Sequence, residues 1–263
     1  MNHIKTIAQE LGLNEKAVEA AVNLIDEGNT IPFIARYRKE ATGSMDDQVL
    51  RKLGERLDYL RGLDKRRDEV KRSIEEQGAM TEELAQKLEA AETLARLEDL
   101  YRPYRPKRKT RASVARARGL APLAELLLAQ NSGTDPEKAA ADYLSGEVPD
   151  TAAALAGARD ILAEQFSDDA ALRQELRELY QRTALLASKA ADAEKKSVYE
   201  QYYDYAEPVS KVAGHRILAV DRGEREGFLK VSIQAESEQA AALLRRRFVR
   251  AGGGPSAAQV TLA

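Results

Sequence analysis

The sequence predicts a mainly α-helical protein: a multi-helix scaffold with an N-terminal helix-turn-helix-like unit, a long spine helix and one small β-hairpin near the C-terminus. Residues typical of helix caps and helix ends recur along the chain. Apolar residues recur at steps of three and four, the spacing that gives a helix one apolar face. Aromatic residues make up 5% of the chain and tryptophan is absent, so we expect a core of leucine and alanine, which favours packed helices over a β-sandwich.

The first 27 residues predict two short helices joined by a turn. Residues 3–12 form an amphipathic helix, and Asn14 caps the helix that follows. This arrangement resembles a helix-turn-helix in shape. A helix that reads DNA places basic or amide residues at its start, whereas this one carries Glu15 and Glu19, which would face phosphates badly. We therefore expect a packing or protein-binding role for this unit.

A third helix carries the first basic cluster. Thr30 caps this helix, and we expect it to end at Gly43. Residues three apart lie on one helix face, so Arg36 and Lys39 are predicted to point the same way, next to Tyr37. They are candidate nucleic-acid contacts. The alternative, which the sequence favours, is an ordinary surface where an arginine pairs with a nearby carboxylate and packs on the tyrosine.

The next helix is predicted to be unusually long. Ser44 and Asp47 resemble a capping box, and residues 45–77 keep a helical apolar pattern with one interruption near Arg67. The apolar positions are Val49, Leu53, Leu57, Leu60, Leu63, Val70 and Ile74. A helix of this length spans roughly 50 Å, more than a small domain, so we interpret it as a spine.

The middle of the chain predicts further helices around a connector that contains proline. The two prolines within 102–106 forbid a helix interior there, and helix resumes near Thr110. Alanine is frequent over 121–193, which lets helices approach closely, and 168–203 is predicted to form one or two more helices.

Only one region has the pattern of β-structure. Residues 216–220 and 228–233 are apolar and rich in β-branched side chains, and turn-like residues lie between them at 222–224, so a hairpin is predicted. A helix over 236–250 follows, and the arginines of its last turns suit a helix C-terminus. The glycines of 252–255 predict a flexible linker.

These patterns divide the chain into four predicted segments. The helix-turn-helix-like unit and the long helix occupy 1–78, and a helical region with the basic connector occupies 79–204. The hairpin and a helix occupy 205–250, and a flexible tail occupies 251–263.

Composition disfavours several classes of function. Cysteine is absent and the two histidines, His3 and His215, are far apart, so we expect neither a disulfide nor a Cys/His metal site. The sequence has no glycine-rich phosphate loop, no secretory signal and no apolar run long enough to span a membrane. No pair of carboxylates stands out, which disfavours a nuclease. We expect a cytoplasmic protein that is not an enzyme and uses no cofactor or metal.

The positive signal is a basic cluster around the connector. The whole chain has a net charge of −2, so any affinity for nucleic acid comes from local clustering. Residues 96–118 contain nine cations and two acids, a local charge of +7, with Tyr101 and Tyr104 between them. Aromatic faces among cations can stack bases. The alternative is a loop whose arginines bind acidic faces of neighbouring helices. The candidate nucleic-acid-binding residues here are Arg102, Arg105, Lys107, Arg108, Lys109 and Arg111.

Three segments carry a family resemblance. They are residues 30–43 (TIPFIARYRKEATG), residues 97–104 (LEDLYRPY) followed by 107–112 (KRKTRA), and residues 215–220 (HRILAV) followed by 222–227 (RGEREG). These motifs resemble the Tex family of bacterial transcription accessory proteins, and the resemblance covers nearly the whole chain.

The resemblance implies a cytoplasmic nucleic-acid-binding protein related to a eukaryotic transcription elongation factor and histone chaperone. In such proteins this helical part is followed by an RNase H-like domain, helix-hairpin-helix elements and a C-terminal S1 domain of OB type, the main nucleic-acid contact. We expect a scaffold segment that binds RNA or DNA and transcription partners. The alternative is a protein–protein interaction module that docks the C-terminal domains of the same protein, or RNA polymerase, without touching nucleic acid.

Overall fold

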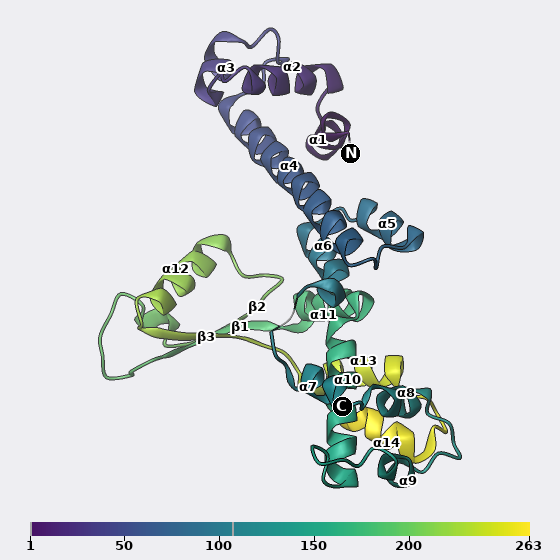
Figure 1. Cartoon of the computed structure of the whole chain (residues 1–263). Helices are drawn as coiled ribbons and strands as arrows, with labels where there is room; N and C mark the ends of the chain where they lie inside the picture. Colours follow the sequence, from purple (N-terminus) through teal and green to yellow (C-terminus); the bar gives the residue numbers. More distant parts are fainter. Residues whose placement is uncertain (1, 107) are drawn as a thin grey trace. The chain divides into compact units, whose positions relative to one another are not determined.

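The computed structural model describes residues 2–106 and 108–263 (Figure 1). Helices dominate, with one small antiparallel sheet, so the prediction of a mainly α-helical fold with a small β element is confirmed. None of the helices in these residues is both long enough and apolar enough to cross a membrane. The chain forms two compact units, Met1–Tyr104 and Arg105–Ala263. The boundary between the units falls inside the predicted segment 79–204, and the boundaries of the four segments predicted from the sequence stay a prediction.

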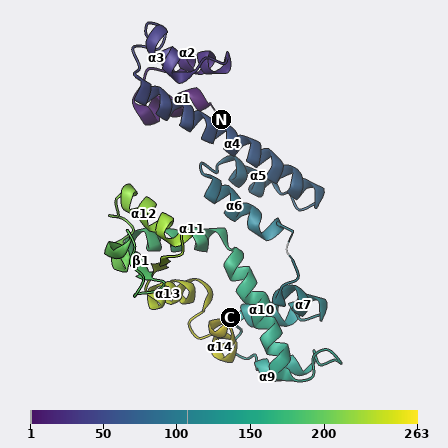
Figure 2. The ribbon, with the colours of Figure 1, turned by 90° about the vertical axis from the view of Figure 1, so that its left-hand side faces the viewer.

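Unit 1 is built along one long helix. Its elements are α1 (His3–Leu11), α2 (Glu15–Asp26), α3 (Ile31–Tyr37), α4 (Asp47–Glu76), α5 (Glu82–Glu89), α6 (Leu94–Tyr101) and the 3-10 helix η1 (Arg102–Tyr104). The first three helices pack on the N-terminal half of α4, and α5 and α6 pack near its other end (Figure 2). The leucines predicted to form the apolar stripe of α4 are buried, so this helix is the spine that the sequence predicts.

The ends of two predicted helices differ from the structure. Asp46, not Ser44, caps α4, because its carboxylate accepts a hydrogen bond from the backbone N–H of Val49 at 2.8 Å. The third helix ends at Tyr37 and does not reach Gly43. Gly43 and Ser44 both have left-handed backbone angles, with φ of 63° and 64°, and the chain leaves the helical path before them in a series of turns.

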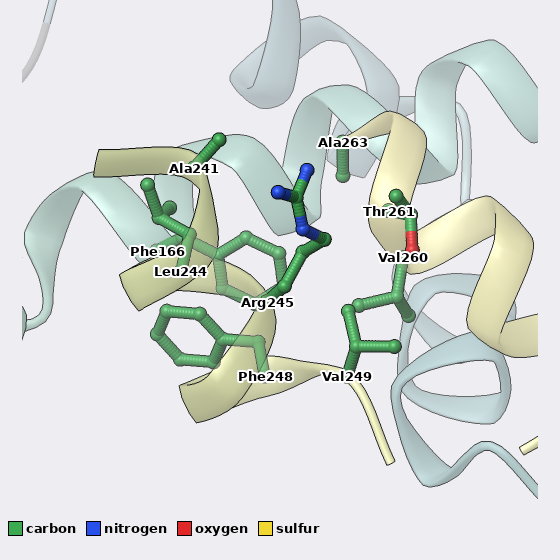
Figure 3. Close-up of a pocket in the computed structure, with 9 residues that line it drawn as sticks. All are labelled: Phe166, Ala241, Leu244, Arg245, Phe248, Val249, Val260, Thr261 and Ala263. Atoms are coloured by element: carbon green, nitrogen blue, oxygen red, sulfur yellow. The ribbon is translucent and has the colours of Figure 1, made fainter. Parts of the chain in front are cut away.

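Unit 2 contains a helical core around α10. Its helices are α7 (Arg111–Ala117), α8 (Ala121–Ala129), α9 (Pro136–Ala141), α10 (Thr151–Asp168), α11 (Ala170–Thr183), α13 (Ser237–Phe248) and α14 (Gly254–Leu262). Alanine and leucine side chains of α7, α8 and α10 fill this core, as the alanine-rich sequence predicts. Phe166 of α10 stacks on Phe248 of α13 with ring centroids 4.0 Å apart, beside a cavity of about 160 Å³ that Val260 of α14 also lines (Figure 3).

The predicted flexible tail is a packed helix. α14 lies against α8, α9 and α10, and its Ser256 and Val260 are buried. Gln130 fixes the segment that leads to it, because its side chain donates to the carbonyl oxygen of Phe248 at 2.7 Å and accepts from the N–H of Arg250 at 2.8 Å. The prediction was wrong because the glycines serve close packing: a Cβ atom on Gly253 would lie 3.0 Å from that of Gln130.

The sheet of unit 2 differs from the predicted hairpin. Its strands are β1 (Leu185–Ala190), β2 (Asp204–Pro208) and β3 (Leu229–Gln234), in the antiparallel order β2-β1-β3, with the 3-10 helix η2 (Glu200–Tyr202) between β1 and β2. Ser188 of β1 pairs with Tyr205 on one side and Val231 on the other. The predicted strand at 228–233 corresponds to β3, whereas β1 lies in the region 168–203, for which only helices were predicted.

The predicted strand at 216–220 is wrong, because these residues belong to the helix α12 (Gly214–Arg225). Gly223, interpreted from the sequence as part of a turn, lies inside this helix and is buried. A Cβ atom there would lie 2.6 Å from Cδ1 of Leu229 and 3.1 Å from Cδ1 of Tyr199. The glycine therefore allows α12 to pack closely on β3, which a sequence pattern does not distinguish from a turn glycine.

We expect Gly223→Ala to destabilise unit 2 by about 1–2 kcal/mol, since the overpacking penalty exceeds the gain in helix propensity. Gly214→Ala in the same helix is the matched control, because a Cβ atom there has no neighbour within 4 Å. Thermal unfolding followed by circular dichroism measures both. Equal unfolding temperatures for the two variants would show that the close packing at Gly223 does not affect the stability of unit 2.

Candidate nucleic-acid interface

The basic cluster of unit 2 is organised by the short helix α7. Thr110 caps this helix, accepting a hydrogen bond from the N–H of Ser113 at 3.0 Å, and Ser113 accepts one from the N–H of Thr110 at 2.9 Å. Glu164 of α10 accepts hydrogen bonds from the Thr110 hydroxyl and from Arg116. This carboxylate therefore joins both ends of α7 to the helical core.

Small residues bring α7 close to α10. Ala112 and Ala115 of α7 are buried. A Cβ atom on Gly157 of α10 would lie 2.4 Å from Cδ1 of Leu120 and 3.3 Å from Cβ of Ala115, so only glycine fits there without a shift. With the alanines turned inward, the long cationic side chains of this segment extend into solvent.

Two grooves flank α7. Groove A has a volume of about 730 Å³ and is lined by Arg108, Lys109, Ser113, Val114, Ala117, Arg118, Gly146 and Glu147. Groove B has a volume of about 530 Å³ and is lined by Lys109, Thr110, Arg111, Val114, Ala115, Arg118, Leu120, Ala153, Ala156, Gly157 and Asp160. Lys109 and Arg118 line both grooves, so the cations converge around one helix.

Carboxylates neutralise only part of this cluster. The Nε atom of Arg111 lies 3.4 Å from Asp160, and that of Arg118 lies 3.5 Å from Glu147. Exposed pairs at such distances contribute little and leave the cation accessible. Glu164 pairs closely with Arg116.

The remaining described cations of the cluster, Arg105, Arg108 and Lys109, are exposed and form no ion pair with any residue that the structure describes. Together with the long pairs of Arg111 and Arg118, the groove-lining Arg108 and Lys109 leave an open cationic surface around α7.

The predicted site residues fall into separate groups. Arg105, Arg108, Lys109 and Arg111 belong to unit 2, and the last three meet around α7. Arg102 is exposed in η1 of unit 1. Lys107 lies outside the described residues.

Arg36 and Lys39 form a second group, in unit 1. Arg36 is in the last turn of α3, whereas Lys39 lies in the turns after it, so the prediction that they share one helix face is wrong. Both side chains are exposed.

Arg118 was missing from the predicted site, although it lines both grooves. A signal for it exists in the sequence, because it follows Arg111 by seven residues, two turns of a helix.

The comparisons with known proteins agree with this architecture. Residues 1–75 match the Tex-like protein N-terminal domain, and residues 131–254 match the Tex central region. The chain belongs to the Tex family. The resemblance inferred from the three sequence motifs is thereby confirmed. The α7 helix lies between the two regions that match the Tex family models.

The relatives of this Tex-family chain are longer than the chain itself. Over 243 residues it is 46% identical to the transcriptional accessory protein Tex of Neisseria gonorrhoeae, covering 90% of this chain and 32% of the relative. Over 245 residues it is 45% identical to protein tex of Bordetella pertussis, covering 90% and 31%. The human S1 RNA-binding domain-containing protein 1 is 27% identical over 242 residues, covering 88% and 24%. The chain spans about a third of the length of the bacterial relatives it matches.

A second basic run of this Tex-family chain is mostly neutralised. Arg245 of α13 pairs with Glu238, and Arg247 pairs with Asp169 at 3.0 Å and with Glu175 at 3.1 Å. The arginines at this helix end therefore stabilise the fold of unit 2. Clustering of arginines in the sequence alone does not distinguish this run from the one around α7.

Proposed function

We propose that this chain is a helical scaffold segment of a Tex-like transcription accessory protein and that it binds nucleic acid through grooves A and B. The observation that carries the proposal is the exposure of Arg108 and Lys109, which have no carboxylate partner among the described residues. Phosphate oxygens would supply the missing partner, independently of base sequence. The proposed role is binding without catalysis, cofactor or metal.

The names of two relatives support this proposal. One is a transcriptional accessory protein and another is an S1 RNA-binding domain-containing protein. The proposal implies that the transcription machinery and nucleic acid, RNA or DNA, are the partners of this chain. It also implies a cytoplasmic location, because bacterial transcription takes place there.

Replacing both Arg108 and Lys109 by glutamine is expected to weaken binding to RNA and DNA oligonucleotides and to reduce its salt dependence. Removal of one phosphate-binding cation lowers the slope of log affinity against log salt by about 0.7–0.9. Fluorescence anisotropy at several salt concentrations measures this slope. The matched control replaces Lys211 and Lys230, two exposed lysines elsewhere in unit 2, by glutamine. The same slope and affinity for both double variants would contradict the proposal.

A second candidate function is protein binding without nucleic-acid contact. The observation that favours it is the exposure of Ile217 and Leu218, two consecutive large apolar residues of α12. Contiguous exposed apolar surface marks protein-interaction sites. The proposed occupant is the remaining part of a full-length Tex protein, because this chain covers about a third of its bacterial relatives.

The two candidates give different results in one experiment. The C-terminal two thirds of a Tex relative is supplied in trans and captured on this chain, with and without nuclease. Protein docking predicts that capture survives nuclease and is abolished in Leu218→Ser, while oligonucleotide binding is unchanged. Capture that disappears with nuclease supports the nucleic-acid function instead.

A further inference from the structure

A small aromatic surface on unit 1 lies outside the grooves of unit 2. Ile34 of α3 is fully buried, and Ile31 approaches Gly54 of α4, so this side of the helix faces the core. Phe33 and Tyr37, one helical turn apart, lie on the exposed side. Their exposed fractions are 36% and 60%, and their ring centroids are 5.2 Å apart, tilted by 47°. The two rings form a ridge that no described side chain covers fully.

Two cations lie against this ridge, and a third follows them in the chain. The guanidinium carbon of Arg38 lies 5.4 Å from the centroid of Phe33, and that of Arg36 lies 5.9 Å from the centroid of Tyr37. Lys39 follows directly and is exposed. Within the described part of the chain none of these three forms an ion pair, and neighbouring Glu40 is exposed and does not pair with them. The predicted pairing of an arginine with a nearby carboxylate is therefore wrong, whereas the predicted packing of an arginine on Tyr37 is confirmed by Arg36.

The backbone that carries these cations is held in place. The hydroxyl of Thr42, which is fully buried, donates to the carbonyl oxygen of Arg38 at 3.1 Å. The N–H of Ser44 donates to the carbonyl oxygen of Lys39 at 2.7 Å. The turn is thus ordered before any ligand arrives, which reduces the entropic cost of binding.

We propose that Phe33, Tyr37, Arg36, Arg38 and Lys39 form a site for unpaired bases of single-stranded nucleic acid. A base stacks on the exposed rings, and the cations contact the phosphates on either side of it. Duplex bases are already stacked on each other and do not offer a free face, so the site selects single strands. It stands on residues of unit 1 alone and does not depend on grooves A and B.

Photo-crosslinking of the whole chain to a single-stranded oligonucleotide that contains 5-iodouracil tests the site directly. Mass spectrometry then locates the crosslinked residue. We expect crosslinks at Phe33 or Tyr37, and we expect an excess of unlabelled single strand, but not of its duplex, to remove them. Crosslinks found only elsewhere in the chain, or removed equally well by duplex, would overturn the proposal.

Affinity measurements on variants supply an independent test. Tyr37→Ala is expected to weaken binding of the single strand about tenfold, whereas Tyr37→Phe retains the ring and the affinity. An abasic oligonucleotide with the same number of phosphates should bind both variants equally. Tyr180→Ala, which removes an exposed tyrosine of unit 2, is the control.

Two further outcomes would also overturn the site. One is an equal loss of abasic-strand binding in Tyr37→Ala, and the other is competition by polyglutamate that matches competition by the single strand, because each would indicate an unselective anion surface. Both measurements are made in the double variant Arg108→Gln and Lys109→Gln, which lacks the proposed groove contacts, so failure of this site and failure of the α7 grooves are distinguished.

Discussion

Replacing Arg67 by alanine is expected to destabilise unit 1 by about 3–5 kcal/mol. The Arg67 side chain is 4% exposed at the centre of α4. Its guanidinium donates to the backbone carbonyl oxygens of Leu88 at 3.0 Å and Ala91 at 2.9 Å, and it pairs with Asp64. These bonds tie the spine to the last turn of α5 and to the segment that follows it. Alanine would remove the guanidinium from the buried carbonyl oxygen of Ala91, leave that of Leu88 with backbone donors alone, and open a cavity beside them.

The neighbourhood of Arg67 makes this loss larger. His3 of α1 and Arg67 both hydrogen-bond the carboxylate of Asp64, the former at 2.6 Å. Burial by itself would raise the pKa of Asp64, but the hydrogen bonds from His3 and Arg67 outweigh it and lower the pKa. Asp64 is therefore ionised at neutral pH, so alanine at position 67 also removes a cation that pairs with this carboxylate.

Denaturant unfolding and hydrogen exchange of peptides from α4 to α6 measure the effect in unit 1 separately from unit 2. Arg67→Met retains most of the volume but not the hydrogen bonds, and we expect an intermediate loss of stability. Arg72→Ala, an exposed arginine on the same helix, should change stability by less than about 0.5 kcal/mol. Coincident unfolding curves for the Arg67 and Arg72 alanine variants would refute the structural role of Arg67.

Replacing Val260 by lysine is expected to release α14 from unit 2 at a cost of about 3 kcal/mol. Val260 is 4% exposed in the core formed by α8 and α10. An ammonium group there would lose its hydration, and Arg245, which lines the adjacent cavity, would repel it. The penalty is limited by the free energy of undocking α14, since the helix can leave the core and take the charge into water.

Limited proteolysis and thermal unfolding detect this release. We expect new cleavage within 250–256 and a lower unfolding temperature for Val260→Lys. Leu262→Lys is the matched control, because Leu262 lies on the same helix but is 68% exposed. A flexible tail, as the glycine-rich sequence predicts, would respond equally to both substitutions, and that result would argue against the docked helix.

Local patterns were sufficient for the elements whose signals are local. The leucine spacing of α4 predicts its position to within two residues at each end. The buried face of an amphipathic helix is visible in its own sequence, because apolar residues recur there every three or four positions. The predicted return to helix near Thr110, after the two prolines, likewise matches the start of α7. The strand β1 gave no such signal, since its LLASKA sequence is compatible with either helix or strand until β2 and β3 pair with it.

The candidate sites were predicted only in part. Counting cations identified the segment around Lys109 and the pair Arg36 and Lys39. It did not separate the exposed cations around α7 from the paired arginines of α13, because their carboxylate partners lie far away in the sequence. Phe33 was overlooked, because an aromatic residue in an apolar stretch is usually buried.

By itself, the sequence determined the helical class, the spine, the family motifs and the position of the main basic segment, because periodicity, caps and local charge act over a few residues. Tertiary structure alone decided which cations keep an acidic partner, why Gly223 and Gly253 are glycine, and that Arg67 belongs to the core. Each of these depends on atoms contributed by distant segments, and no pattern within one segment records which atoms will lie opposite it.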